Sequence, residues 1–150
     1  PRESELEVPF SSKRKMAATV HALPTNQRLE SLQFQESITH VAIIKGAPDL
    51  LLPKVSSLCS VAEAQGGRVL NVPGERLLDD DRAELFNKND ELSQRALRSL
   101  VVAVRPLTER EVEEMKAVTA KERLTTLVET PGLCFLSLWG ISDPPRVMVP

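Results

Sequence analysis

Residues 40–49, which read HVAIIKGAPD, combine the clearest strand signal of the chain with a sharp break after it. The apolar and largely β-branched run His40–Ile44 predicts a strand. Gly46 and Pro48 predict the end of that strand and the start of a helix, because a proline in the first helical turn leaves no hydrogen bond unmade. Lys45 is therefore expected at a strand end, beside a glycine that has no Cβ to hold a ligand away from the backbone.

Outward from this break, strand and helix signals follow one another without strict alternation. Strands are expected at Leu6–Phe10, Met16–Leu23, around Leu32 and Phe34 as a hairpin extension, and at Arg68–Val72, Leu100–Val104 (closed by Pro106) and Leu133–Trp139. Helices are expected from Pro48 to about Cys59, over Arg82–Leu97, and from the capping box of Thr108 and Glu111 to about Val128. This order predicts the α+β class, with a largely antiparallel sheet flanked by helices.

Three consecutive aspartates, Asp79–Asp81, precede the second of these helices. We interpret them as an N-terminal cap whose negative charge is favourable beside the helix dipole. A metal site is the alternative, but consecutive carboxylates at a helix start do not converge on one ion.

The composition excludes several classes of partner. The chain has 150 residues, enough for one domain with a sizeable core, and its 19 basic and 21 acidic residues give a net charge of -2. This balance gives no general reason to expect nucleic acid or an anionic membrane surface as a partner. No apolar run reaches the ~20 residues that a membrane helix needs. Cys59 and Cys134 lack disulfide or zinc spacing, which favours two buried thiols in a reducing compartment.

Three places in the chain could hold a phosphorylated ligand. The segment Phe10–Lys15 offers an aromatic ring and cations, Lys45 with Gly46 offers a cation at a strand end, and Arg98 offers a fork suited to phosphate. Each also has a plainer interpretation, as a core aromatic, a solvated hairpin tip or a surface cation. The chain contains no P-loop, no GxGxxG after a strand and no GxSxG frame, so no candidate for independent catalysis is visible.

Four segments, in this order, resemble motifs of the P-type cation-transporting ATPases. Residues 8–16 resemble the phenylalanine-containing adenine-site loop, and residues 44–49 resemble a KGAPE-type motif. Residues 96–105 are similar to a GLRVLALAYR segment, and residues 135–146 are similar to the strand and DPPR hinge that lead back to the phosphorylation domain. Together they span nearly the whole chain, which resembles the nucleotide-binding (N) domain of this family.

The resemblance implies an antiparallel sheet with flanking helices, inserted between the halves of a phosphorylation domain. It implies that Phe10 stacks on adenine, that cations lie along the nucleotide, and that Leu100 packs near the base while Arg98 approaches the phosphates. Family members often carry a basic residue where this chain has Ser12, so this contact depends on the neighbouring cations. The nucleotide-binding residues implied in this way are Phe10, Ser12, Lys15, Lys45, Gly46, Arg98 and Leu100. Asp143 matches the hinge motif and is not expected in the site.

The same resemblance sets the expected scope of the chain. Residues 1–140 would form the nucleotide-binding domain, without its upstream part, and residues 141–150 the hinge returning to the phosphorylation domain. With no DKTGT or TGES motif, the chain is expected to bind ATP (Mg-ATP in the full-length pump) without being catalytic alone. The expected partners are ATP and the phosphorylation and actuator domains of the same polypeptide, on the cytoplasmic side of a membrane, with no nucleic acid and no direct membrane contact.

Two questions stay open at this stage. The alternative function is an interaction or regulatory module that keeps the fold but no longer binds ATP usefully. The transported ion cannot be read from these residues, although a calcium, magnesium or related divalent or alkali cation is favoured over a heavy metal, because neither His21 nor His40 lies in a histidine-based signature.

Overall fold

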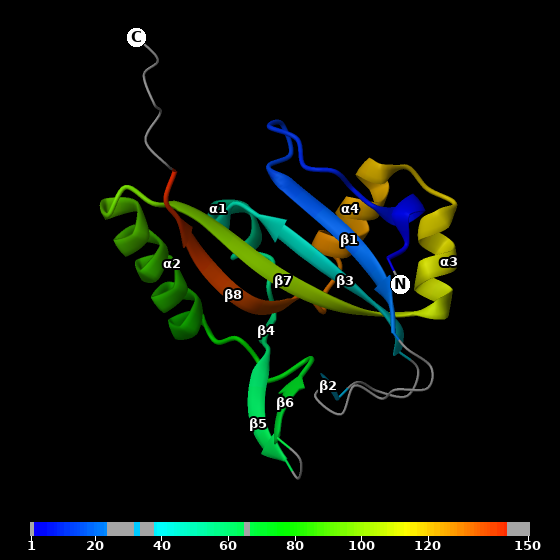
Figure 1. The fold of residues 1–150 in the computed structure, drawn as a ribbon, viewed down its shortest axis with the longest axis horizontal. Helices are drawn as coiled ribbons and strands as arrows, with labels where there is room; N and C mark the ends of the chain where they lie inside the picture. Colours follow the sequence, from blue (N-terminus) through cyan, green and yellow to red (C-terminus); the bar gives the residue numbers. More distant parts are fainter. Residues whose placement is uncertain (1, 24–31, 34–37, 65–66, 144–150) are drawn as a thin grey trace.

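A five-stranded sheet forms the centre of the computed structural model, which describes residues 2–23, 32–33, 38–64 and 67–143 (Figure 1). In spatial order its strands are β1 (Met16–Ala22), β3 (Ile38–Gly46), β7 (Arg98–Thr108), β8 (Cys134–Ile141) and β4 (Ser57–Leu58). Neighbouring strands are antiparallel except for the short β4, which is parallel to β8. The predicted largely antiparallel sheet is confirmed.

A smaller sheet and several helices complete the described part of the chain. The small sheet has the order β2 (Leu32–Gln33), β6 (Gly67–Asn71) and β5 (Ser60–Ala64). The helices are the 3-10 turn η1 (Ser4–Leu6) and α1 (Pro48–Leu51), α2 (Asp79–Gln94), α3 (Glu109–Lys116) and α4 (Ala120–Glu129). The α+β class is therefore confirmed. None of the described helices is long and apolar enough to span a bilayer.

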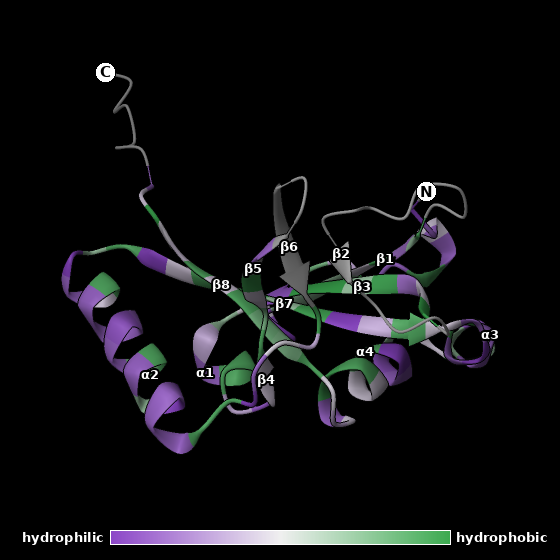
Figure 2. Ribbon diagram, turned by 90° about the horizontal axis from the view of Figure 1, so that it is seen from below, coloured by the Kyte–Doolittle hydropathy of each residue, from purple (hydrophilic) through white to green (hydrophobic). Residues whose placement is uncertain are grey.

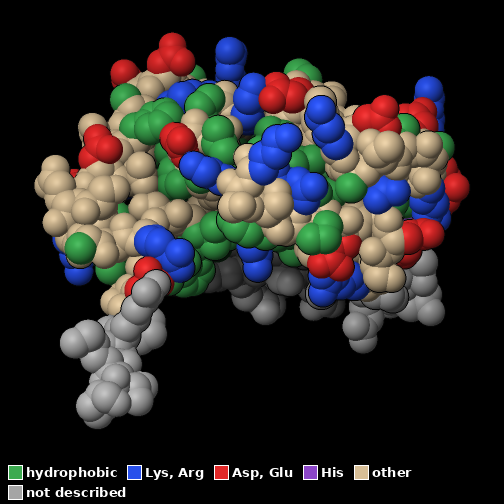
Figure 3. All heavy atoms as spheres, turned by 90° about the horizontal axis from the view of Figure 1, so that it is seen from above, with side chains coloured by type: hydrophobic (Ala, Val, Ile, Leu, Met, Phe, Trp, Pro, Cys, Tyr) green, Lys and Arg blue, Asp and Glu red, His purple; other side chains and the backbone are tan. Residues whose placement is uncertain are grey.

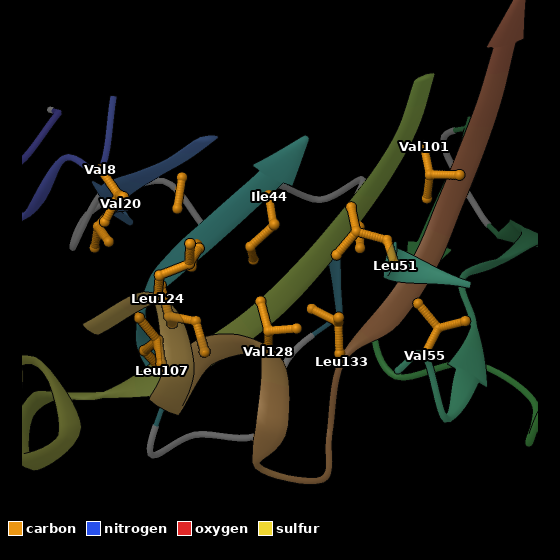
Figure 4. Close-up of a cluster of buried hydrophobic side chains, with 14 of the residues drawn as sticks. Val8, Val20, Ile44, Leu51, Val55, Val101, Leu107, Leu124, Val128 and Leu133 are labelled. Carbon is orange, nitrogen blue, oxygen red and sulfur yellow. The ribbon is translucent and has the colours of Figure 1, made fainter. Parts of the chain in front are cut away.

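The two faces of the large sheet are covered differently. Helices α1 and α4 lie on one face, here called the core face, and the small sheet lies on the other, here called the open face (Figure 2). Side chains from α1, α3 and α4 meet alternate strand residues on the core face (Figure 4). The fully buried members of this core include Val20, Ala42, Ile44, Leu51, Leu52, Val101, Ala103, Leu127 and Leu133. Each buried aliphatic side chain stabilises the fold by about 1.5–3 kcal/mol, so the helices are held firmly to this face.

The three aspartates begin α2 rather than precede it. The N-cap is Leu78, whose backbone N–H donates to Asp81 Oδ2 at 2.9 Å, and all three carboxylates lie in the first turn, where their charge is favourable beside the helix dipole. The helix is hydrophilic over most of its surface (Figure 2), and only a few residues, among them Leu85 and Phe86, reach the core. Within the described ranges, no group of three His, Cys, Asp or Glu side chains could hold a metal ion.

Two expected elements, the strand Leu6–Phe10 and the long helix after Pro48, are not found in the structure as predicted. The first segment forms η1 and then a single antiparallel bridge between Val8 and Ala18. Pro9 has no N–H with which to extend that bridge into a ladder. Helix α1 ends at Leu51, since Pro53 cannot donate the next helical hydrogen bond. A turn follows α1, and then β4 and β5 form where the helix was expected to continue.

The end of β7 and the pairing of β2 also differ from prediction. Strand β7 continues through Pro106, which pairs with Val41 on β3. Strand β8 pairs with β7 only as far as Val104, so Pro106 lies where one side of β7 has no partner in this register, and a proline is tolerated there. In the N-terminal half, β2 pairs in parallel with β6 and does not extend a hairpin, while Phe34 lies outside the described residues.

The helix expected over residues 108–128 is two helices. The predicted capping box is confirmed: Glu111 N donates to Thr108 Oγ1 at 3.3 Å, and Thr108 N donates to Glu111 Oε2 at 2.8 Å. Thr119 and Glu122 form a second box with the same pair of bonds and begin α4. The sequence therefore contained the signal for the break between α3 and α4.

The two cysteines, distant in sequence, meet between β4 and β8. Both thiols are free; Cys134 is buried and Cys59 is half-buried against the same small apolar cluster. Ser57 Oγ donates to Cys134 Sγ at 2.9 Å. Hydrogen bonds from the thiol of Cys59 and the hydroxyl of Ser57 lower the pKa of Cys134 to about 7, with a smaller contribution from the charge of Arg105.

Candidate functional site

Four strand ends meet at one end of the large sheet. Strand β1 begins at Met16, β3 ends at Gly46, β7 begins at Arg98 and β8 ends at Ile141. Met16 pairs with Gly46 and Gly46 with Val101, so β7 and β8 extend three residues beyond the ends of β1 and β3. We call this region, with the loop of residues 9–15 before β1, the loop end of the sheet; it lies towards the upper left in Figure 1. Every binding residue predicted from the sequence lies on the loop or on the adjoining parts of β3 and β7.

The loop itself is a tight turn held by its own hydrogen bonds. Lys15 N donates to Ser11 O at 2.8 Å, Arg14 N donates to Ser11 Oγ at 3.2 Å, and the Arg14 guanidinium donates to Pro9 O. Lys15 has φ of 52°, in the left-handed region that residues with a side chain seldom adopt. Such strained positions persist where their surroundings fix them, and they gather at binding and catalytic sites.

The loop is attached to β3 through Lys15 and Gly46. Ala47 N donates to Lys15 O at 3.2 Å. A Cβ added to Gly46 would lie 3.0 Å from Lys15 O and 2.5 Å from Met16 Cγ, closer than side chains normally approach. The glycine is therefore required so that the loop can pack directly on the end of β3. In the structure, the missing Cβ leaves room for Met16 and the loop backbone, while room for a ligand beside Gly46 stays a prediction.

Phe10 is not a core aromatic. The bridge between Val8 and Ala18 holds this segment along the outer side of β1, and 63% of the Phe10 side chain is exposed. Ser12 is exposed on the same loop. An exposed phenyl ring on a rigid loop offers a stacking surface to an aromatic ligand, and removing it leaves the core intact.

Lys45 and Leu100 occupy the open face. Successive strand residues point to opposite faces, and Lys45 alternates with the buried Ile44. Lys45 pairs with Val102 of β7. Leu100 is two residues before Val102 in β7, so its side chain lies on the same face. Lys45 is exposed and Leu100 is half-buried, so a cation and an apolar side chain lie on adjacent strands of the same surface.

Arg98 begins β7 at the edge of this surface. Its guanidinium forms an ion pair with Asp143, 3.0 Å between Nη2 and Oδ1, with both side chains largely exposed. Arg105, in the same sequence motif, plays another part: it is buried on the core face and donates to Thr130 O at 2.7 Å, at the end of α4. Burial lowers the pKa of the Arg105 guanidinium. Of these two arginines, only Arg98 is exposed to a ligand, which would share its guanidinium with Asp143.

The chemistry gathered at the loop end is suited to binding an anion with an aromatic part. Seen from above, Lys and Arg side chains cluster near the middle of this side of the molecule, among apolar atoms (Figure 3). The loop supplies Lys13, Arg14 and Lys15, and the strands supply Lys45 and Arg98. Several cations near an exposed phenyl ring can hold a polyphosphate and its base by charge and stacking.

Sequence reasoning missed two residues of this surface. Trp139 lies directly opposite Leu100, and Asp143 is the ion-pair partner of Arg98, although Asp143 was assigned only to the hinge motif. No motif indicates Trp139, because its place on the open face depends on the register of β7 and β8. The remaining residues of the expected DPPR hinge, from Pro144 onward, lie outside the described residues.

Comparison with known proteins supplies an independent view of the chain. A protein-family model described as "P-type ATPase, cytoplasmic domain N" matches residues 2–148. The P-type sodium-transporting ATPase4 of Plasmodium falciparum is 37% identical over 151 residues, and that of Toxoplasma gondii is 38% identical over 156 residues. The sodium/potassium-transporting ATPase subunit alpha-1 of Catostomus commersonii is 30% identical over 145 residues.

These matches cover nearly all of this chain but little of the relatives. The aligned regions include 97%, 99% and 96% of the chain, and 12%, 11% and 12% of the three relatives. The chain thus corresponds to a small part of much longer transport proteins.

Proposed function

Because this chain belongs to the family of cytoplasmic N domains of P-type ATPases, we propose that it binds ATP and positions it for phosphoryl transfer to an aspartate in a separate phosphorylation domain. The observation that carries the proposal is the meeting of an exposed phenylalanine, a rigid cationic loop and two strand-borne cations at one end of the sheet. Phosphoryl transfer depends mainly on positioning and electrostatic stabilisation, so a domain that only holds ATP contributes directly to the reaction.

Each group has a role that its position supports. Phe10 stacks on the adenine, and its exposure leaves the ring free to do so. Lys15, with Ser12 on the same loop, lies along the nucleotide, while Lys45 beside Gly46 supplies a cation from β3. Leu100 contacts the base from β7. Arg98, at the start of β7, approaches the phosphates, since its planar fork matches phosphate oxygens.

Magnesium would enter with the nucleotide, as Mg-ATP in the full pump. The cations of the loop end fit the phosphate oxygens, and the described residues contain no cluster of three side chains of the kinds that hold a metal ion. We therefore assign no metal ligand to these residues.

Residues 1–140 are proposed to form the binding domain and residues 141–150 the hinge to the phosphorylation domain. Strand β8 ends at Ile141, so the chain leaves the sheet beside Arg98. Phosphates held by Arg98 would then lie close to the hinge and point towards the domain that receives the phosphoryl group. The phosphorylation and actuator domains of the same polypeptide are the proposed protein partners.

For the whole transporter, the relatives favour sodium over a divalent or heavy-metal ion. Two of them are named sodium-transporting ATPases and a third is a sodium/potassium-transporting ATPase subunit. This proposal concerns the longer protein, because the chain spans about one-eighth of the length of these relatives.

The competing proposal is a degenerate module that keeps the N-domain fold for interaction or regulation without useful ATP binding. The observation in its favour is Ser12, which stands where family members often carry a cation. The loop cations that follow it, Lys13 to Lys15, and the strained backbone of Lys15 favour the binding site.

Replacing Lys45 with glutamine tests the proposal. A charge-assisted bond to phosphate is worth about 1.5–3 kcal/mol, and solvent exposure reduces this, so we expect about tenfold weaker ATP binding by isothermal titration calorimetry. Adenosine affinity should change little, since adenosine carries no phosphate. Lys121→Gln is the matched control, because Lys121 is also exposed but belongs to α4 on the core face. Equal effects of the two substitutions on ATP affinity would remove the support for a specific contact.

A further inference from the structure

Trp139 is a large aromatic side chain that the fold leaves uncovered at the loop end of the sheet. It is the only tryptophan of the chain, and 58% of its side chain is exposed. It lies on β8 directly opposite Leu100 of β7, and paired residues of antiparallel strands point to the same face. Trp139 therefore belongs to the open face, next to the residue that the proposed function places near the base.

The indole is oriented along its strand. Its Nε1 donates to Ser137 Oγ at 2.7 Å. Ser137 lies opposite Val102, and Val102 lies opposite Lys45. The indole ring thus leans from the position opposite Leu100 towards Ser137, which lies in line with Val102 and Lys45 across the sheet. Its Nε1–H is already hydrogen-bonded within the chain. What it offers to a ligand is an apolar face rather than a hydrogen bond.

Two cations, Lys45 and Arg98, lie near the exposed face of the indole ring. Lys45 is two strands away, and neighbouring strands are about 4.8 Å apart, so the separation of the two strands is about 10 Å. Arg98 is two residues from Leu100 along β7, or about 7 Å. Leu100 thus lies between the two cations, and Trp139 widens the apolar surface beside it, which is complementary to a nucleoside that carries a polyphosphate.

We propose that Trp139 is a further nucleotide-contacting residue, whose indole packs beside Leu100 against the nucleoside part of the bound nucleotide. This inference rests on the proposed function, since Leu100 and Arg98 mark the base and phosphate ends of the ligand. Its position directly beside Leu100 on the open face assigns the indole to the nucleoside end of the ligand. This contact requires the nucleoside part of the ligand and does not depend on its phosphates.

The fluorescence of Trp139 gives a direct readout of this contact. The chain has no tyrosine and no second tryptophan, so its tryptophan emission comes from this residue alone. Titration of the wild-type chain with ATP and with adenosine should change the emission saturably, whereas inorganic tripolyphosphate should leave it unchanged. A change with tripolyphosphate equal to that with ATP would overturn the proposal.

Variants measure the contribution of the indole to affinity. Trp139→Ile keeps a residue that suits a strand and should weaken ATP binding about two- to tenfold by calorimetry, the range typical of one aromatic contact. Trp139→Phe should recover part of the loss. Leu136→Ala is the matched control, because Leu136 is another exposed apolar residue of β8 but has no partner in the register with β7. Circular dichroism of each variant checks that the strand is retained.

The outcomes separate this inference from the proposed function. If ATP binds to the wild-type chain by calorimetry but neither the emission nor the Trp139→Ile affinity changes, Trp139 is not in the site and the ATP-binding proposal stands. The exposed indole would then be assigned to contact with a neighbouring domain. If ATP does not bind at all, both proposals fail together.

Discussion

Replacing Phe10 with alanine is expected to weaken ATP binding at least tenfold while changing the free energy of unfolding by less than about 0.5 kcal/mol. Stacking of a base on an aromatic side chain is worth about 1–3 kcal/mol, and here no other described aromatic ring lies on the loop. The core is unaffected because 63% of the side chain is exposed. Calorimetry measures the first quantity, and urea unfolding followed by circular dichroism measures the second.

Val61→Ala serves as the control for this substitution. Val61 is also 63% exposed, but it lies on β5 of the small sheet, away from the loop end. The pair therefore distinguishes loss of a specific stacking surface from general loss of exposed apolar area. Unchanged ATP affinity in Phe10→Ala would favour the degenerate module over the binding domain.

Replacing Gly46 with valine should have the larger effect on stability and an equally large effect on binding. A Cβ at this position would press against Met16 and against the backbone carbonyl of Lys15, which cannot rotate away as the tip of a side chain can. Overpacking of this kind destabilises a core by about 1–3 kcal/mol. The loop must also move off the end of β3, which breaks the bond from Ala47 to Lys15, so ATP affinity should fall more than tenfold.

Gly140→Ala separates these two effects. A Cβ at Gly140 would meet only methyl groups of Leu92 and Leu97, at 2.8 and 3.0 Å, on the side of the sheet that α2 covers. It should lower the free energy of unfolding but change ATP affinity less than twofold. Near wild-type affinity in Gly46→Val would show that the attachment of the loop to β3 does not shape the site.

Much of the sheet could be predicted because its signals are local. The run of residues 40–44 and the break at Gly46 and Pro48 place the end of β3 within two residues. The capping box of Thr108 placed the start of α3. The box of Thr119 and Glu122 was equally visible, and weighing it would have divided the expected long helix into two.

Other features depend on contacts between distant residues. Neither β4 nor β5 shows a strong strand pattern, and β4 exists because residues 57–58 pair with β8, more than seventy residues later. The exposure of Phe10 could not be read from its type, since a lone phenylalanine is more often buried. The site residues were grouped by the family resemblance, and only the register shows that they share one end of a sheet.

Once the bounds of a strand are known, the alternation of its side chains gives the face on which each residue lies, as the two arginines of β7 illustrate. Arg98 and Arg105 differ by an odd number of positions, so a continuous strand places them on opposite faces, as the structure does. The expected strand, Leu100–Val104, contained neither arginine, so their faces follow from the observed length of β7. For Trp139 the face follows only from its pairing with Leu100.

An amide chemical-shift titration of the labelled chain with ATP, repeated with GTP and with free phosphate, tests the central claim most directly. The account predicts saturable shifts with ATP that cluster at residues 10–15, 45–47 and 98–100. Free phosphate should reproduce only the part of these shifts that arises at the cations. No shifts with ATP, or ATP shifts identical to those of free phosphate, would contradict the claim that this domain binds the nucleotide.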